Sequence, residues 1–424
     1  MKQLPQAVVA CATLGLLAVP CLATEPAKQA PFELQVGEGK LRFYGFLRAD
    51  AQYDDSKPND PQVVAFIRSE DETRPISATV ARPGDSDFDL HAKLTRFGVD
   101  IGGYTVEALH GAVVSGKAEI DFYNAAASES RGFLRVRHAY LNLAWKHSAL
   151  LFGQTSDVIS PLFPAVNADF VMWNAGNLAD RRPQVRYTWS PTVGAGGKFL
   201  LQTALGATGA VDNQSLDLAP AGTSVVANLD GVDSAVPTTQ LRLAYQGASW
   251  VAGKKFELGA WGHSAREELP EGAPRINGRN DWDSRALGID IKLPLAAKFD
   301  FEAELWSGKN LDDVRGGIGQ GVNVTAGDRN LGAEVESTGG WAQVGFSPCT
   351  WFTLYGGYSF DDPEDGLAAS GARDRNTVYF VATRFKPSAN LSFGLDYLNW
   401  TTEWTGGLND GTDNRFIAYA QWNF

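Results

Sequence analysis

The sequence predicts an all-β fold, a transmembrane antiparallel β-barrel of about 16 strands, from three observations. An apolar leader opens the chain, segments that alternate between apolar and polar residues follow it, and the connections between those segments alternate between long and short. No stretch after the leader reaches the roughly 20 apolar residues that a membrane-crossing helix needs. If the chain crosses a membrane, we expect a closed barrel, because only helices and closed barrels pair all backbone groups within lipid.

Residues 1–23 are predicted to be a signal peptide that is removed on export. Lys2 supplies a charge near the start, an apolar run follows, and the stretch ends on Cys21-Leu22-Ala23 with small side chains where the cleavage enzyme requires them. Export places the mature chain in the cell envelope. We expect residues 24–40 to form a short N-terminal periplasmic segment and residues 41–424 to form the barrel.

Each predicted strand has an apolar face and a polar face. In the first, Leu41–Tyr53, Phe43 and Leu47 alternate with Arg42 and Arg48, which gives one face for lipid and one for water. The other predicted strands are Leu90–Ile101, Gly116–Tyr123, Leu134–Trp145, Leu150–Thr155, Gln184–Trp189, Phe199–Ala207, Gln240–Tyr245, Phe256–Ser264, Ala286–Leu293, Phe299–Ser307, Trp341–Phe346, Phe352–Phe360, Thr377–Phe385, Leu391–Asn399 and Arg415–Phe424.

The connections between these strands alternate in length along nearly the whole chain. Asp54–Asp89 and Gly308–Gly340 are long, whereas Pro294–Lys298 and Lys386–Asn390 are short. Transmembrane barrels show this asymmetry, with long loops outside the cell and short turns on the periplasmic side. The alternation therefore predicts a barrel in the outer membrane of the cell, surrounded by outer-membrane lipid.

The last predicted strand ends on aromatic side chains. Trp422 and Phe424 lie on its apolar face, and this ending resembles the C-terminal signal of outer-membrane barrels. The pattern predicts that Trp422 and Phe424 form an assembly signal, with the barrel assembly machinery as its partner.

Four short motifs in the N-terminal half carry a resemblance to a known family. They are Thr95-Arg96-Phe97-Gly98, Leu134-Arg135-Val136-Arg137-His138-Ala139-Tyr140, Gly153-Gln154 and Arg182-Pro183-Gln184-Val185-Arg186-Tyr187. In order and spacing they resemble the DcaP-like porins, which are trimeric sixteen-stranded outer-membrane channels. The resemblance implies a homotrimer that lets small anionic solutes pass passively, dicarboxylates among them.

The third long connection, residues 156–183, is the candidate constriction loop. It contains Pro161 and Pro164 and is too apolar for a freely solvated loop. Its apolar residues include Phe163, Phe170, Val171, Met172 and Trp173. We expect the loop to bend into the barrel and narrow it; the alternative is that these residues cover a trimer contact or the barrel rim.

Period-two alternation places a set of arginines and acids on the inner face of the predicted barrel. The candidate pore-lining residues are Arg42, Arg48, Arg96, Arg135, Arg137, Arg186, Glu119 and Asp121. Arg96 belongs to this set if its strand changes phase near Arg96-Phe97. Two interpretations remain: the arginines guide anions with their forked donors, or they pair with acids on neighbouring strands.

Two other classes of function compete with a channel. A soluble secreted β-protein could bind or hydrolyse carbohydrate with Glu302 and Glu304, and an outer-membrane barrel could be an enzyme. The five histidines show no HExxH spacing and no serine lies in a GxSxG motif. We therefore predict no catalytic residues, cofactor, metal site or nucleic-acid partner, and a passive channel for small hydrophilic solutes.

Overall fold

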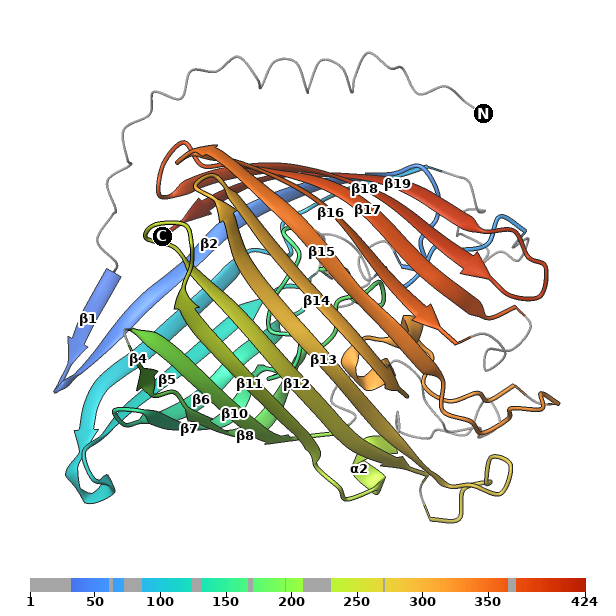
Figure 1. The fold of residues 1–424 in the computed structure, drawn as a ribbon, viewed down its shortest axis with the longest axis horizontal. Helices are drawn as coiled ribbons and strands as arrows, with labels where there is room; N and C mark the ends of the chain where they lie inside the picture. The colour runs from blue at the N-terminus through green and yellow to red at the C-terminus, as the bar shows by residue number, and fades with distance from the viewer. Residues whose placement is uncertain are drawn as a thin grey trace.

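Sixteen long antiparallel strands close into a barrel in the computed structural model (Figure 1). The structure describes residues 32–60, 64–71, 86–123, 132–166, 171–194, 196–208, 230–269, 271–325, 327–364 and 371–424, and element counts refer to these residues. Each long strand pairs with the next, and β19 (Gly411–Asn423) pairs with β2 (Gly39–Asp54) to close the ring. The other long strands are β4 (Arg96–Val106), β5 (Ala112–Asp121), β6 (Arg135–Ala144), β7 (Ser148–Ser156), β8 (Arg181–Trp189), β10 (Gly197–Gly206), β11 (Thr238–Ala248), β12 (Lys255–Glu268), β13 (Asp281–Ala296), β14 (Phe299–Lys309), β15 (Glu336–Cys349), β16 (Phe352–Pro363), β17 (Arg373–Phe385) and β18 (Leu391–Trp404). The predicted all-β barrel is confirmed.

Three short strands accompany the barrel in the described part of the chain. β1 (Phe32–Val36) and β3 (Asp87–His91) pair with β2, and β9 (Thr192–Val193) pairs with β10. The helical elements are η1 (Glu107–Leu109), α2 (Asp230–Asp233), η2 (Asp312–Val314) and η3 (Gly317–Gly319). Among the described residues, no helix has the length and apolar character needed to cross a membrane.

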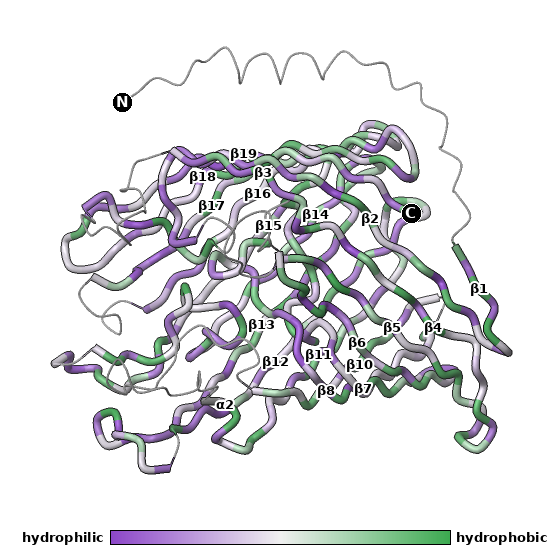
Figure 2. Tube along the Cα trace, turned by 180° about the vertical axis from the view of Figure 1, so that it is seen from behind, coloured by the Kyte–Doolittle hydropathy of each residue, from purple (hydrophilic) through white to green (hydrophobic). Residues whose placement is uncertain are grey.

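The alternating pattern sorts side chains between the outer wall and the lumen. In β2, Phe43 and Leu47 are exposed on the outer face, whereas Asp50 and Gln52 are buried on the inner face. Figure 2 shows hydrophobic and hydrophilic residues alternating along many of the strands. Outward-facing apolar residues on other strands include Phe97, Leu141, Phe152, Leu243, Ile289, Val344 and Val381. The outer wall therefore suits the hydrocarbon of a bilayer.

The predicted N-terminal segment, residues 24–40, contains β-structure. β1 forms a hairpin with the start of β2, in which Phe32 lies opposite Phe43 with the ring centroids 5.6 Å apart. Residues 1–31, which include the predicted signal peptide, lie outside the described residues. The first barrel strand begins at Gly39, two residues earlier than the alternation predicts.

The prediction of one continuous strand over Leu90–Ile101 is wrong. The chain leaves the ladder between the end of β3 at His91 and the start of β4 at Arg96. In this gap, Thr95 Oγ1 accepts a hydrogen bond from the Arg48 N–H at 3.0 Å and lies 3.2 Å from the Arg48 carbonyl oxygen, to which it donates. The break resets the alternation, so that Arg96 faces the lumen and Phe97 faces outward.

A β-bulge at Arg137 changes the phase of β6. β5 and β6 are in register up to the pair Ile120–Val136, and the next pair is Glu119–His138, so Arg137 is an extra residue on its strand. A bulge of this kind re-aims the side chains that follow it. Strict alternation through this strand is therefore wrong beyond Arg137, and His138 also faces the lumen.

The C-terminal residue helps to close the barrel. Phe424 and Gly45 exchange two backbone hydrogen bonds, with N···O distances of 3.1 and 3.3 Å, and the Phe424 ring lies 6.0 Å from Trp422 and 6.1 Å from Phe97. The last residue therefore contributes both a ladder rung and apolar contacts at the seam between β19 and β2.

Deletion of Phe424 is expected to reduce the amount of assembled barrel, because it removes this rung and the terminal aromatic of the predicted assembly signal. The measurement is the heat-modifiable band in outer-membrane fractions. Deletion of Leu408, an exposed residue of the loop between β18 and β19, is the control. Normal heat-modifiable migration and yield in the Phe424 deletion would contradict the assembly role.

Candidate functional site

The connection between β7 and β8 runs through the barrel lumen in its described parts, residues 157–166 and 171–180. Three of its backbone N–H groups donate to side chains of the inner wall: Val158 to Gln240 of β11 at 2.8 Å, Leu162 to Glu304 of β14 at 2.8 Å, and Ala165 to Gln343 of β15 at 2.7 Å. β11 is separated from β8 by β10 alone, whereas β14 and β15 lie farther round the ring. This connection, which we call the lumen loop, therefore crosses the lumen from one wall to the other.

Of these three wall side chains, Glu304 accepts the most hydrogen bonds. Its carboxylate accepts hydrogen bonds from Ser160 Oγ, from Leu162 N and, at 3.3 Å, from Trp341 Nε1, and the residue is 1 % exposed. A carboxylate buried to this degree is tolerated only when donors surround it. Glu304 thus fixes the height at which the loop crosses the lumen.

The interpretation of Glu302 and Glu304 as a hydrolytic pair does not fit this geometry. Glu302 accepts a hydrogen bond from Gln343 Nε2 at 2.8 Å and pairs with Lys292, whereas Glu304 is covered by the loop. The two carboxylates do not flank a common open space in which a glycosidic bond could lie.

Apolar packing also holds the loop against the inner wall. Val166, Met172 and Ala175 share a buried cluster with Val64 and Ile67 of the loop after β2. The wall residues of that cluster are Val378, Phe380, Leu398, Trp400 and Ile417. Val171, Met172 and Trp173 therefore lie inside the barrel rather than on the rim or at a contact between subunits; Phe170 lies outside the described residues.

The loop between β14 and β15 packs against the loop between β7 and β8. Ala179 N donates to the Val314 carbonyl at 2.8 Å, and Arg315 forms an ion pair with Asp180 at 2.9 Å. Burial alone would raise the pKa of the Asp180 carboxyl, but Arg315 and Arg181 hold that pKa below its ordinary value. Asp180 is therefore ionised at neutral pH. Its ion pair with Arg315 is lost only as the pH falls through that lowered pKa.

On the other side of the loop lies a cavity of about 350 Å³ that we call the arginine cavity. Apolar loop residues, Phe163 and Trp173 among them, form one wall, and guanidinium groups from β2, β4, β6 and β8 form the other. The five arginines that line it are Arg48, Arg96, Arg135, Arg137 and Arg181.

Two carboxylates of β5 orient the guanidinium groups of β6. Asp121 receives a forked pair of hydrogen bonds from Arg135 at 2.7 and 2.8 Å. Arg137 bridges Glu119 and Asp121, at 2.8 Å to each. Arg96 of β4 also faces Glu119, with Nη1 and Oε1 3.4 Å apart. The acids are buried and the arginines line the cavity in front of them.

The cations of this region outnumber the anions. Five arginines line the cavity, and Arg315 stacks on Trp173 with its guanidinium carbon 5.1 Å from the ring centroid. Among the described residues, these six arginines pair with four carboxylates, a formal excess of two positive charges. The four carboxylates are Asp50, Glu119, Asp121 and Asp180.

The predicted pore-lining residues thus divide into two groups. Arg48, Arg96, Arg135 and Arg137 line the arginine cavity, with Glu119 and Asp121 as their partners. Two others do not line it: Arg42 pairs with Asp100 and is half exposed, and Arg186 donates to Gln184 and to the Ser156 carbonyl.

Comparison with known proteins agrees with this architecture. A family model described as DcaP outer membrane protein matches residues 24–225. These residues are therefore similar to the DcaP outer membrane protein family. The resemblance predicted from the four motifs is therefore confirmed.

Solved structures extend the likeness to the whole barrel. The outer membrane channel DcaP of Acinetobacter baumannii has a TM-score of 0.66 at 19% identity, covering 93% of this chain and 100% of that one. OmpF of Salmonella typhi, in complex with daunomycin, has a TM-score of 0.57 at 12% identity, covering 93% and 100%. The anion-selective porin from Comamonas acidovorans has a TM-score of 0.52 at 11% identity, covering 91% and 100%. At these identities the likeness shows the fold alone, and no curated protein sequence matches the chain.

Sequence reasoning missed two titratable residues that line the arginine cavity, Arg181 and His138. Arg181 falls within the predicted loop 156–183, so it was not assigned to a strand face, yet β8 begins with it. His138 was assigned no role in the lumen, because the bulge that turns it inward has no signature in residue type. Arg181 lies three residues before Gln184, the first residue of the predicted strand, and a charged residue so close to that strand is the signal that could have found it.

Glu304→Gln is expected to loosen the loop, because the change removes one of the two carboxylate oxygens that hold Ser160 and Leu162, and an unsatisfied buried group costs about 1–3 kcal/mol. The expected result is a larger single-channel conductance with more open-channel noise. Asp300→Asn, which neutralises a partly exposed acid on the same strand face, is the matched control. Unchanged conductance and noise in Glu304→Gln would contradict the positioning role.

Proposed function

We propose that the protein is a passive diffusion channel for small hydrophilic solutes that favours anions, and that it has no enzymatic activity. The observation that carries this proposal is the excess of positive charge in the arginine cavity, on the open side of the loop that crosses the lumen. A channel of this kind needs a lining and a constriction and no catalytic centre.

The pairing of arginines with acids does not consume all of their donors. Arg135 binds Asp121 through Nε and Nη2, and Arg137 uses Nε and Nη1. Among the described residues, Nη1 of Arg135 and Nη2 of Arg137 have no hydrogen-bond partner. The acids therefore hold the guanidinium groups in place while leaving N–H groups for a carboxylate, since each arginine carries five donors.

The expected preference is moderate in size. One uncompensated charge 4 Å from a carboxylate is worth about 1 kcal/mol even in bulk water, which corresponds to a factor of roughly five. Screening over about 8 Å at physiological salt confines the effect to the narrow part of the lumen. Small dicarboxylates fit this chemistry, because they carry two groups that guanidinium forks can bind.

The double substitution Arg135→Gln with Arg137→Gln removes the excess of two charges. We expect the reversal potential in a salt gradient to move toward cation preference at low salt, and uptake of a dicarboxylate to slow about fivefold relative to a neutral sugar. Arg275→Gln with Arg285→Gln, a pair of exposed arginines that line no cavity described here, makes the same change in net charge and serves as the control. Wild-type selectivity in the first variant would leave these arginines as structural partners only.

We also propose that the protein works as a homotrimer. OmpT of Vibrio cholerae folded in vitro, a structural neighbour with a TM-score of 0.53 at 14% identity that covers 91% of this chain, was solved in a trimer form. Cross-linking in mild detergent is expected to give dimer and trimer bands. These bands should be absent from a boiled control sample that received no cross-linking reagent. Detection of monomer alone across a range of reagent concentrations would contradict the trimer.

A further inference from the structure

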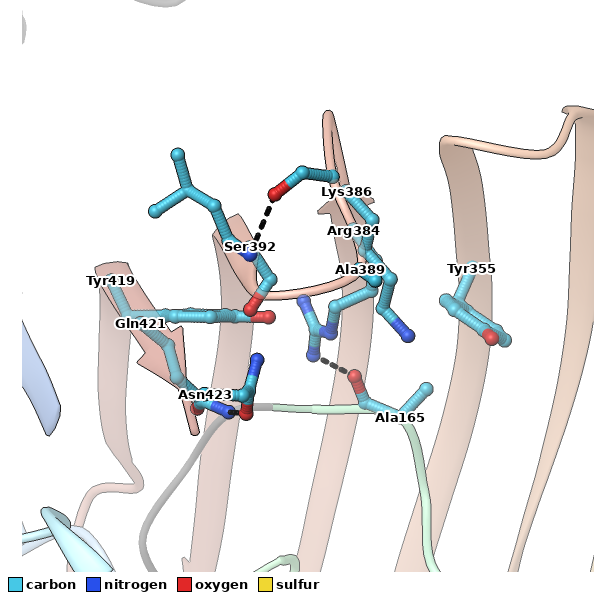
Figure 3. A pocket seen from close by; sticks show the side chains of 11 residues that line it. Ala165, Tyr355, Arg384, Lys386, Ala389, Ser392, Tyr419, Gln421 and Asn423 are labelled. Carbon is cyan, nitrogen blue, oxygen red and sulfur yellow. Dashed lines mark hydrogen bonds between the residues drawn. The ribbon is translucent and has the colours of Figure 1, made fainter. Parts of the chain in front are cut away.

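A second cavity of about 380 Å³ lies at the short-turn end of β16 to β19, and we call it the turn-side cavity. Figure 3 shows Tyr355 and Tyr419 on opposite sides of it, with Arg384 between them and Ala165 of the lumen loop beside Arg384. Lys386, the first residue after β17, also lines it. None of the pore-lining residues predicted from the sequence lines this cavity.

The charge lining this cavity is positive. Arg384 pairs with Asp396, at 2.5 Å between Nη1 and Oδ1, and its Nη2 donates to the Ala165 carbonyl. Lys386 is exposed, and among the described residues its ammonium group has no hydrogen-bond or ion-pair partner. No aspartate or glutamate lines the cavity, and its other polar groups include the hydroxyls of Ser388 and Ser392.

The turn-side cavity and the arginine cavity meet at a shared contact. Arg48 lines the arginine cavity and stacks on Tyr419, with its guanidinium carbon 4.4 Å from the ring centroid, and Arg384 lies 5.7 Å from the same ring. Arg48 Nη1 also donates to Gln421 at 3.4 Å, and Tyr419 and Gln421 both line the turn-side cavity. Basic groups therefore follow one another from the short-turn end to the arginine cavity.

We propose that the turn-side cavity is a second anion site, in which Lys386 binds a carboxylate that enters or leaves through the short-turn end of the barrel. This proposal rests on the proposed passage of anions. A solute carboxylate bound there has the Ser388 and Ser392 hydroxyls as hydrogen-bond donors and the Tyr419 ring as an apolar surface. An exposed, unpaired ammonium group at a channel mouth raises the rate at which anions arrive, and the effect weakens as salt screens it.

The test is single-channel recording of Lys386→Gln with succinate added first to one side of the bilayer and then to the other. At low salt, we expect the rate of succinate blocking events to fall about threefold from one side only, because Lys386 lies at one mouth. Lys298→Gln, in the short turn between β13 and β14, removes an exposed lysine that does not line the cavity and is the matched control. Both variants should give the heat-modifiable band of a folded barrel.

Unchanged blocking rates in Lys386→Gln, an equal fall from both sides, or the same fall in Lys298→Gln would each overturn the second site. The proposed function is tested separately by the wild-type reversal potential. An anion-selective wild-type channel with unaltered blocking in Lys386→Gln contradicts the second site alone, whereas a wild-type channel without anion preference contradicts the function on which it rests.

Discussion

In hydrocarbon, a backbone N–H or C=O group without a partner costs several kcal/mol, and the pairing of β19 with β2 is what removes the last free edge of this sheet. Every other feature depends on that closure. A closed ring of sixteen strands leaves a lumen wide enough for water, so selectivity must come from whatever enters the lumen. Closure also brings the C-terminal Phe424 beside Gly45 of the first long strand, far apart in sequence.

The inner wall divides into a half that binds loops and a half that faces water. Along β14 to β19, apolar residues such as Phe380 and Trp400 and the buried carboxylate of Glu304 hold the described parts of the lumen loop. Along β2 to β8, arginines anchored on Glu119 and Asp121 remain open to the cavity. On the loop-bearing half, Glu304 and Gln343 accept hydrogen bonds from loop N–H groups, and Arg384 and Lys386 place positive charge at its short-turn end.

The barrel wall faces lipid on its outside and water on its inside, so apolar and polar residues alternate along each strand, as Phe43 and Arg48 do in β2. This alternation made the strands predictable. Local departures carried no such signal. The break before Arg96 depends on the Thr95 side chain replacing ladder bonds, and the bulge at Arg137 depends on its register with β5. Lys386 could not be placed from sequence, since only the closed ring brings its turn near Arg48. The strand count was accordingly predictable, and the composition of the cavities only in part.

The excess of positive charge beside the lumen loop is the central claim, and the reversal potential of the purified wild-type protein in a salt gradient tests it most directly. Our account predicts a potential of the sign that marks anion preference, largest at low salt and declining as the ionic strength rises past the point where the screening length falls below about 8 Å. A potential near zero at low salt, or one of the sign that marks cation preference, would contradict the account.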